Sequence, residues 1–266
     1  MQPGPLIGSG RTADVFAVDD AWVLRRYRDG RDASAEAAVM SHVFRHGYPV
    51  PRVDPGANGD YGYPVPRVYP GANGDHGRAA SGADLSANGD LGCAASGVGP
   101  RANGDLLVER LSGPTMAEAL QDGVITSGEA GEALAGLLHR LHALPPLDAT
   151  GPAGSVLHLD LHPENVLLTP RGPVVIDWAD ARQGPPALDW GMSVLILAEV
   201  AVGPRVEAPV ARAVLASLLG AAASQVVDLD GALAIRSANP TLGRREGAPC
   251  RSRSAGARSA SAHRIP

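Results

Sequence analysis

The sequence predicts an α+β fold, in which a small antiparallel sheet with one helix is followed by a mainly helical region. Residues 6–27 contain three short runs of strand-forming residues separated by turn residues. Apolar residues recur at helical spacing in 34–46 and again in 126–144. Residues 156–178 hold two short apolar strands around a Pro-Arg-Gly turn. Strands are therefore expected at the N-terminus, and helices in most of the remainder, with one hairpin set among them.

The composition is that of a globular protein large enough to bury a sizeable core. The chain has 266 residues, of which 44% are hydrophobic and 19% charged. The formal net charge is −5, but residues 244–266 carry six Arg against one Glu, so the preceding part is at −10 (−5 minus +5). An acidic body argues against nucleic-acid binding and is compatible with a cationic substrate.

The sequence also predicts a cytoplasmic protein that does not enter a membrane. Cys93 and Cys250 form neither a metal-binding pair nor a disulfide pattern, as is usual in a reducing compartment. The N-terminus has no basic stretch followed by an apolar run, so no signal peptide is expected. The longest apolar run, 192–202, is interrupted by Glu199 and is too short to span a bilayer. We interpret it as a buried helix.

The first turn of the predicted sheet carries a glycine pattern. Residues 8–15 have the spacing G-x-G-x-x-A-x-V, with Gly8, Ser9 and Gly10 at the turn itself. Glycines let a backbone approach phosphate groups closely, but the same pattern also fits a plain hairpin turn. Strand-type residues follow on both sides, so the pattern does not open a helix as a dinucleotide-binding fingerprint does.

A possible ion pair joins the third strand to the first helix. The strand 22–27 contains Arg25 and Arg26, and strand register decides which of the two points inward. In the helix, which Asp32 can cap and Gly47 can close, Glu36 lies about one turn from the start. A strand cation facing such a Glu is a phosphate-binding arrangement, whereas the alternative is a solvated Glu with two surface arginines. The chain contains no lysine, so any lysine role falls to Arg.

A repeat then interrupts the sheet. Residues 48–60 recur as 63–75, and Ala-Asn-Gly-Asp returns at 87–90 and 102–105, at a fixed spacing of 15 residues. The later copies have lost the apolar positions that stacked repeats would bury, and their Gly, Ala, Ser, Asn and Asp cannot offset the entropy of ordering. We predict a disordered surface loop over about 54–105, from which 61–105 could be removed at little cost to the fold.

A strand and two helices follow the repeat. Residues 106–111 form a strand that ends in polar residues. Thr115 and Thr126 are each followed three residues later by Glu, which is the capping-box spacing for a helix start. His139 and His142, in the second helix, are expected to be surface or satisfied core histidines rather than metal ligands.

Residues 156–178 carry the groups suited to a metal–phosphate site. His158-x-Asp160-x-x-x-x-Asn165 comes before the first strand of the hairpin, and Asp177 comes directly after the second. Mg²⁺ takes oxygen ligands, often one or two carboxylates together with substrate phosphates. A hydroxyl nucleophile needs a positioned base, and phosphoryl transfer depends mostly on positioning and charge neutralisation. This hairpin can supply all of these groups.

The remainder is helical up to a change of composition. Asp189 precedes an apolar helix that ends near 202, and 204–220 and 229–237 are expected to form further helices. Residues 244–266 are rich in Arg, Ser and Ala without periodicity, so we predict a disordered tail.

Taken in order, the Gly8–Gly10 turn, Arg25, Glu36, HLDLHPEN and IDW resemble the aminoglycoside phosphotransferase and choline kinase-like family, small-molecule relatives of protein kinases. The resemblance covers roughly 6–242 apart from the repeat. It implies a two-lobed protein-kinase-like fold. Residues 1–108 would form a nucleotide-binding N-lobe, 109–243 a C-lobe with the catalytic loop, and 244–266 the tail.

The same resemblance implies a role for each matched residue. Asp160 would be the catalytic carboxylate, and His158 would brace its loop. Asn165 and Asp177 would ligate Mg²⁺, and Asp189 would support the catalytic loop structurally. The residues implied to bind ATP are Gly8, Ser9 and Gly10 over the phosphates, Arg25 on the α/β-phosphates with Glu36 orienting it, and the segment from Glu109 to Leu111 facing adenine.

We therefore expect an ATP- and Mg²⁺-dependent phosphotransferase that acts on a hydroxyl of a small molecule, with aminoglycosides among the candidate acceptors. Arg25 stands where the family has a lysine, and Ala13 stands where it has the third glycine of the loop. The first departure and the repeat motivate an alternative, a catalytically weak nucleotide-binding protein of the pseudokinase kind. A damaged gene product that keeps the motifs without folding well is the third hypothesis.

Overall fold

The computed structural model describes residues 4–10, 12–54, 105–150 and 153–238. The predicted disorder of the repeat loop and of the C-terminal tail therefore falls on residues outside these ranges, apart from the two ends of the loop. One of those ends, Asp105, is the first residue of a strand, so the sheet resumes one residue earlier than expected.

The N-terminal sheet has the predicted antiparallel strands. It consists of β1 (Leu6–Ser9), β2 (Ala13–Ala17), β3 (Trp22–Tyr27) and β4 (Asp105–Glu109), paired in that order. The residues flanking the insert pair with each other, because Val53 bridges Val108 and the N–H of Asp54 donates to the carbonyl of Leu107. The sheet therefore continues across the point at which the repeat enters the chain.

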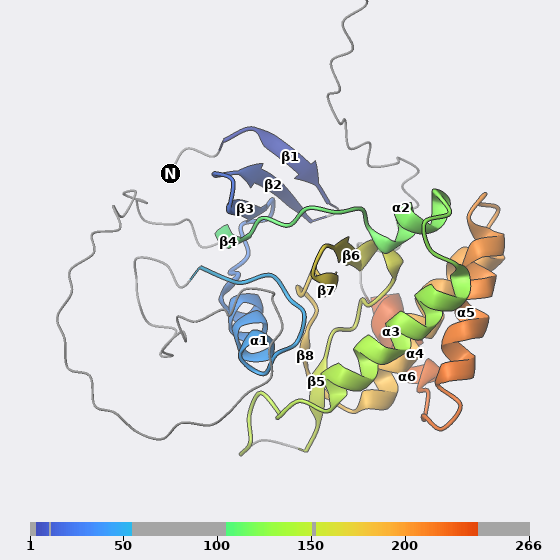
Figure 1. Cartoon of the computed structure of the whole chain (residues 1–266). Helices are drawn as coiled ribbons and strands as arrows, with labels where there is room; N and C mark the ends of the chain where they lie inside the picture. The colour runs from blue at the N-terminus through green and yellow to red at the C-terminus, as the bar shows by residue number, and fades with distance from the viewer. Residues whose placement is uncertain (1–3, 11, 55–104, 151–152, 239–266) are drawn as a thin grey trace, which may run out of the picture. The chain divides into compact units, whose positions relative to one another are not determined.

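The helix α1 (Ser34–Arg45) lies below this sheet in the view of Figure 1. Its N-cap is Ala33 rather than the predicted Asp32, whose carboxylate instead accepts the N–H of Ser34. Gly47 ends the helix as expected, with a φ of 76° that glycine adopts without a steric cost. The helix buries its predicted apolar face, which includes Val39, Met40 and Val43, and Glu36 is buried with it.

Two small antiparallel pairs lie in and beside residues 156–178, which we call the catalytic stretch after its predicted role. The hairpin of β6 (Val166–Thr169) and β7 (Gly172–Val175) follows a short 3₁₀ turn, η1 (Pro163–Asn165). The strand β5 (Ser155–Leu157) pairs with β8 (Arg182–Gly184). β8 was not predicted, because its three residues, Arg-Gln-Gly, have no strand-forming pattern.

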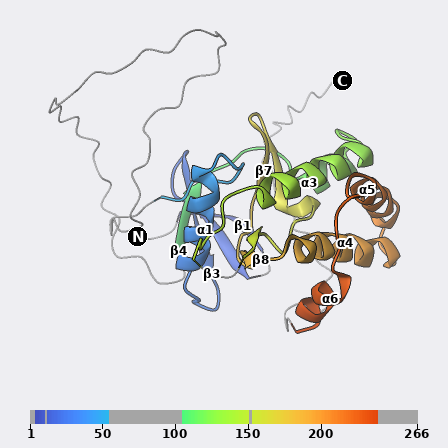
Figure 2. The ribbon, with the colours of Figure 1, turned by 90° about the horizontal axis from the view of Figure 1, so that it is seen from below.

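The C-terminal helices lie close to their predicted positions. They are α2 (Met116–Gln121), α3 (Ser127–His142), α4 (Pro186–Val202), α5 (Ala208–Ala221) and α6 (Leu229–Ala238). Both capping boxes are present, at Thr115 with Glu118 and at Thr126 with Glu129. Figure 2 shows α3, α4 and α5 packed side by side. α4 begins before Asp189, which lies in its first turn, and α5 begins four residues later than expected.

One hydrophobic core runs from the sheet into the helices. Its members include Tyr27 in β3, Val43 in α1, Leu138 in α3, Trp178 after β7 and Leu218 in α5. The α+β prediction is confirmed by this arrangement of a sheet-containing N-terminal region and a mostly helical remainder. The domain boundaries at 108 and 243 stay a prediction. Among the residues that the structure describes, no helix is both long and apolar enough to cross a membrane.

Candidate active site

The loop after β5 is bonded to the buried carboxylate of Asp189. Its two oxygens accept the backbone N–H groups of His158, at 3.0 Å, and of Leu159, at 2.7 Å. His142 places its Nε2 2.9 Å from the same carboxylate. Leu159 has a φ of 62°, a left-handed conformation that a leucine keeps only when its surroundings fix it. Asp189 therefore fixes the turn that presents Asp160.

The side chain of His158 connects this loop to the end of β7. Its Nδ1 accepts the N–H of Asp160 at 3.2 Å, so the proton lies on Nε2, which donates to the carbonyl of Ile176 at 3.1 Å. The ring is fully buried against the edge of Trp178, and this burial lowers the pKa of His158 below its ordinary value. A neutral His158 thus links Asp160 to the residue before Asp177, as the predicted bracing role requires.

Asp160 and Asn165 are joined directly. The Nδ2 of Asn165 donates to the backbone carbonyl of Asp160, at 2.8 Å, and to its carboxylate Oδ2, at 3.0 Å. With the amide nitrogen engaged in this way, the side-chain oxygen of Asn165 is left to accept a bond or to ligate a cation. His162, which was not singled out from the sequence, places its Nε2 3.7 Å from the same Oδ2.

Asp177 follows β7 and has a φ of 62°. The N–H of Ile176 donates to the carbonyl of Asn165 at 3.0 Å, so the backbones beside the two predicted metal ligands are bonded to each other. Asp180 lies in the same group of carboxylates: desolvation, followed by the charges of Asp160 and Asp177, raises its pKa. Asp180 was also missed, because one Asp three residues after another has no distinctive spacing.

Arg25 is the arginine that points inward. Its Nη1 forms an ion pair with Glu36 and its Nη2 one with Asp177, so one guanidinium spans the sheet, α1 and the catalytic stretch. Its neighbour Arg26 pairs instead with Asp105, its partner residue on β4, at 2.6 Å. Strand register thus settles what the sequence left open. Burial works against the Arg25 charge, but Asp177 and Glu36 outweigh this effect and raise its pKa.

Glu36 is held by three donors. Besides Arg25, the hydroxyl of Tyr27 and the N–H of Trp178 donate to its carboxylate, the latter at 3.2 Å. Burial raises the pKa of Glu36, and the charge of Arg25 opposes this shift. The interpretation of Glu36 as a solvated surface residue is therefore wrong, and the predicted contact between it and Arg25 is present.

The glycine turn has the hairpin geometry expected from the sequence. The N–H of Gly10 donates to the carbonyl of Ala13 at 2.8 Å, and Ser9 is paired with Asp14 across the strands. A Cβ placed on Gly8 would meet Val15 at 3.7 Å, which is an ordinary contact. Packing within the protein therefore does not require glycine at position 8, and close approach of a ligand stays a separate hypothesis.

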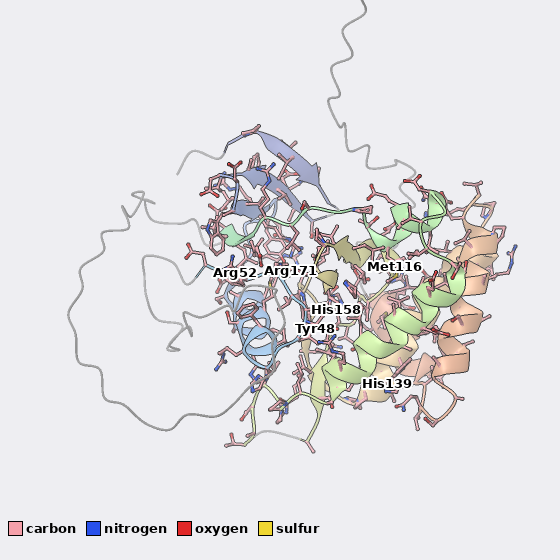
Figure 3. All side chains as sticks on the ribbon, viewed as in Figure 1. Tyr48, Arg52, Met116, His139, His158 and Arg171 are labelled. Carbon is pink, nitrogen blue, oxygen red and sulfur yellow. The ribbon has the colours of Figure 1, made fainter. Side chains whose placement is uncertain are left out.

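The segment predicted to face adenine is partly engaged within the protein. The N–H of Glu109 donates to the carbonyl of Arg52, and its carboxylate lies 3.5 Å from Nε of Arg52 and 3.0 Å from Nη2 of Arg171. Figure 3 shows both arginines at this end of the sheet. The N–H of Arg110 donates to the carbonyl of Ala21. These bonds leave the main chain near Leu111 as the better candidate for a contact with adenine.

The donor set fits a hard cation that shares its ligands with phosphates. No group of three or more His, Cys, Asp and Glu side chains able to hold a metal occurs in the described part of the chain. Asp177 and the amide oxygen of Asn165 offer two oxygen ligands, which is the incomplete set expected where Mg²⁺ is completed by substrate phosphates and water.

Comparison with known proteins places these residues in a family. The model of the phosphotransferase enzyme family matches residues 4–224. A search among curated proteins found no match. Similar solved structures include an aminoglycoside phosphotransferase from Streptomyces rimosus, with 17% identity over 87% of this chain and 89% of that chain and a TM-score of 0.47.

A choline/ethanolamine kinase family protein from Mesorhizobium loti has 18% identity over 90% of each chain and a TM-score of 0.42. An amicoumacin kinase in complex with AMP-PNP, Ca²⁺ and its ligand has 12% identity over 85% of this chain and 73% of that chain, with a TM-score of 0.49. These low similarities carry no part of the assignment. The family match covers most of the chain, including every residue of the site, and the chain therefore belongs to the phosphotransferase enzyme family.

Proposed function

We propose that the chain is an ATP- and Mg²⁺-dependent phosphotransferase that moves the γ-phosphate of ATP to a hydroxyl group of a small molecule. The observation that carries the proposal is the convergence of Arg25, from the N-terminal sheet, with Asp177, from the catalytic stretch. They are 152 residues apart in the sequence, yet their side chains form an ion pair. A phosphate-binding cation and a metal-binding carboxylate must meet in this way if both act on one nucleotide.

Asp160 is the base or orienting group for the acceptor in this proposal. The acceptor oxygen attacks the γ-phosphorus, its proton passes to the Asp160 carboxylate, and the bond between the γ-phosphorus and the β–γ bridging oxygen breaks to leave ADP. Asn165 donates to one oxygen of this carboxylate at 3.0 Å, which restrains the rotation of the Asp160 side chain. The backbone turn supported by Asp189 fixes the position of the whole group.

The nucleotide is bound by the sheet and the segment after it. The backbone of the glycine turn covers the phosphates, and the main chain near Leu111 faces adenine. Arg25 holds the α- and β-phosphates, while Glu36 keeps the guanidinium on the inner face of the sheet. An arginine binds two phosphate oxygens through the parallel N–H groups of its planar fork, whereas a lysine acts as a point charge.

Mg²⁺ is bound by Asp177 and Asn165 in the proposal, and when bound it neutralises charge on the phosphates. In the present arrangement Arg25 contacts one oxygen of Asp177. In the proposal, the other carboxylate oxygen of Asp177 binds the cation, and Arg25 moves from Asp177 to the phosphates when ATP binds.

The acceptor is a small-molecule alcohol present in the cytoplasm, and cationic acceptors such as aminoglycosides suit the acidic site best. Asp160, Asp177 and Asp180 provide a concentration of negative charge where the acceptor would approach. Charge alone also favours other amino alcohols, so the assay below uses acceptors of graded charge.

The alternative is a nucleotide-binding protein with weak activity. The observation that favours it is the same ion pair, because Arg25 neutralises the carboxylate expected to bind the metal. In this alternative, ATP binds but phosphate does not move.

The two proposals are separated by a transfer assay with radiolabelled ATP, Mg²⁺ and a panel of aminoglycosides, other amino alcohols and neutral polyols. We expect a labelled product with at least one acceptor, and we expect Asp160→Asn to lower its rate by about 10²–10⁴-fold, the usual share of general-base catalysis. Asp148→Asn is the matched control, since Asp148 lies in an exposed turn, where it bonds with Thr150 and with Gln183. If ATP binds but wild type and Asp160→Asn are equally inactive with every acceptor, the alternative is correct.

A further inference from the structure

A second arginine, Arg28, is bonded to the glycine turn. Its Nη2 donates to the hydroxyl of Ser9 at 2.5 Å, to the carbonyl of Gly10 at 3.0 Å and to the carboxylate of Asp14 at 2.6 Å. Its Nε donates to the other oxygen of Asp14 at 3.1 Å, and Ser9 itself donates to Asp14 at 2.7 Å. One guanidinium therefore connects both strands of the turn and a carbonyl within it.

Backbone bonds fix the same turn at its two ends. The N–H of Gly10 donates to the carbonyl of Ala13 at 2.8 Å, and the N–H of Arg28 donates to the carbonyl of Thr12 at 3.0 Å. Arg28 thus holds the turn through its main chain on one side and through its side chain on the other.

This network lies on the opposite face of the sheet from Arg25. Asp14 is paired with Arg26 across β2 and β3, whereas Ala13 is paired with Tyr27, and neighbouring side chains on a strand point to opposite faces. Tyr27 and Arg25 contact Glu36 on the inner face. Arg28 therefore acts on the turn from the outer face and has a different task from Arg25.

The charges of this network persist over the usual pH range. Hydrogen bonds from Arg28 and then from Ser9 lower the pKa of Asp14 to about 2. The side chains of Arg28 and Asp14 are 46% and 26% exposed, so the pair is partly screened by solvent and its effect should be moderate.

We propose that Arg28 is a positioning residue, which with Asp14 and Ser9 holds the glycine turn in the conformation that receives the phosphates of ATP. That the turn receives ATP rests on the proposed function, whereas the structural role of Arg28 in holding the turn does not. The hydroxyl of Ser9 is engaged by the network, so the turn contributes to phosphate binding through its backbone.

A direct role for Arg28 in binding phosphate makes the opposite prediction for one variant. If Arg28 were a phosphate ligand, Asp14→Asn would release it and also remove a negative charge, so ATP would bind more tightly. If Arg28 positions the turn, Asp14→Asn loosens the turn and ATP binds more weakly. The sign of the change in Kd therefore decides between the two roles.

The experiment measures the Kd of Mg²⁺–ATP by calorimetry for wild type, Asp14→Asn, Arg28→Gln and the double variant. We expect each single substitution to raise Kd by about two- to fivefold, the range for a partly exposed charged contact, and we expect the double variant to be no weaker than the worse single one. Glu199→Gln is the matched control, because it breaks a similar Arg–Glu pair between α4 and α6, and it should leave Kd unchanged. A lower Kd for Asp14→Asn overturns the positioning role.

Hydrogen exchange without nucleotide tests the turn independently of its ligand. In wild type the N–H groups of Gly10 and Arg28 are bonded across the turn, and both should exchange faster in Arg28→Gln than in wild type or Glu199→Gln. Unchanged exchange in Arg28→Gln contradicts the proposal that Arg28 holds the turn. Failure of wild type to bind ATP, with exchange altered as expected, instead contradicts the proposed function.

Discussion

The catalytic loop and the glycine turn are held by contacts of different kinds. At the catalytic loop, the fully buried Asp189 and His158 bond to backbone groups. At the glycine turn, Arg28 and Asp14 bond side chain to side chain in contact with solvent. Water can replace the second kind of bond but not the first. The loop around Asp160 is therefore fixed by buried bonds made on folding, whereas the glycine turn is held by bonds that solvent can weaken.

The largest expected effect comes from the buried support of the catalytic loop. Asp189→Ala removes the acceptor of two backbone N–H groups and leaves His142 without its partner. We expect the free energy of unfolding to fall by about 3–5 kcal/mol, as when one member of a buried pair is removed. Urea unfolding followed by circular dichroism measures the change. Asp148→Ala, in an exposed turn, is the control, and an equal loss in both variants contradicts the assigned role of Asp189.

The next effect concerns the cation between the two regions. Arg25→Met removes the charge that contacts both Glu36 and Asp177, and we expect the Kd of ATP to rise by about 10–100-fold, the value of one charge-assisted hydrogen bond. Arg25→Lys keeps the charge without the fork and should fall between wild type and Arg25→Met. Arg26→Met is the matched control, since Arg26 is the next residue in β3 but pairs with Asp105 instead. Equal losses in the Arg25 and Arg26 variants would show that only net charge matters.

Stability should also depend on pH through the buried histidine. Burial lowers the pKa of His158 in the folded protein, whereas in the unfolded chain it is near 6.5. At a pH between these two values, the unfolded chain binds a proton that the folded protein does not. His158 therefore does not lower the free energy of unfolding above pH 6.5, but lowers it progressively as the pH drops below 6.5.

Urea titrations at pH 7.5 and pH 5.5 measure this change. One such histidine contributes a slope of at most about 1.4 kcal/mol per pH unit. His158→Gln should reduce the slope, even though it also lowers stability at both pH values. A protein that is more stable at pH 5.5 than at pH 7.5 would show that another group dominates.

The smallest effect is expected from the repeat. Deleting 61–105 brings Asp60 next to Leu106, so that an aspartate again occupies the position from which Asp105 pairs with Arg26. The bridge between Val53 and Val108 joins the flanking segments as well. We expect the Kd of ATP to change by less than about twofold, since surface insertions affect stability little. A large loss of affinity would show that the repeat contributes to the site.

The sequence predicted what depends on local pattern. The two capping boxes and the hairpin after Asn165 follow from spacings of a few residues, and each occurs in the structure. The contact of Glu36 with a strand cation was expected from the order of the two elements, and it is present as well. Contacts between distant segments could not be read in this way. The choice of Arg25 over Arg26 depended on strand register, and the contact of His142 with Asp189 joins residues 47 positions apart.

A related limit applies to residues near the candidate site that the sequence did not single out. His162 lies two residues after Asp160 but has no spacing that marks it, and Asp180 is brought near Asp160 by the fold. Arg28 reaches Asp14 across two strands, although its own sequence neighbourhood is that of an ordinary turn. The role of Glu109 also depended on the fold, because its carboxylate is engaged by Arg52 and Arg171.

The proposed function is tested most directly by whether Mg²⁺ strengthens ATP binding through Asp177. Calorimetry of ATP binding with and without Mg²⁺ requires no knowledge of the acceptor. We predict that Mg²⁺ strengthens ATP binding to wild type and that Asp177→Asn removes this effect while the fold persists, because Asp177 is partly exposed. An equal effect of Mg²⁺ on wild type and on Asp177→Asn, or none on either, would contradict a metal–nucleotide site at the junction of the sheet and the catalytic hairpin.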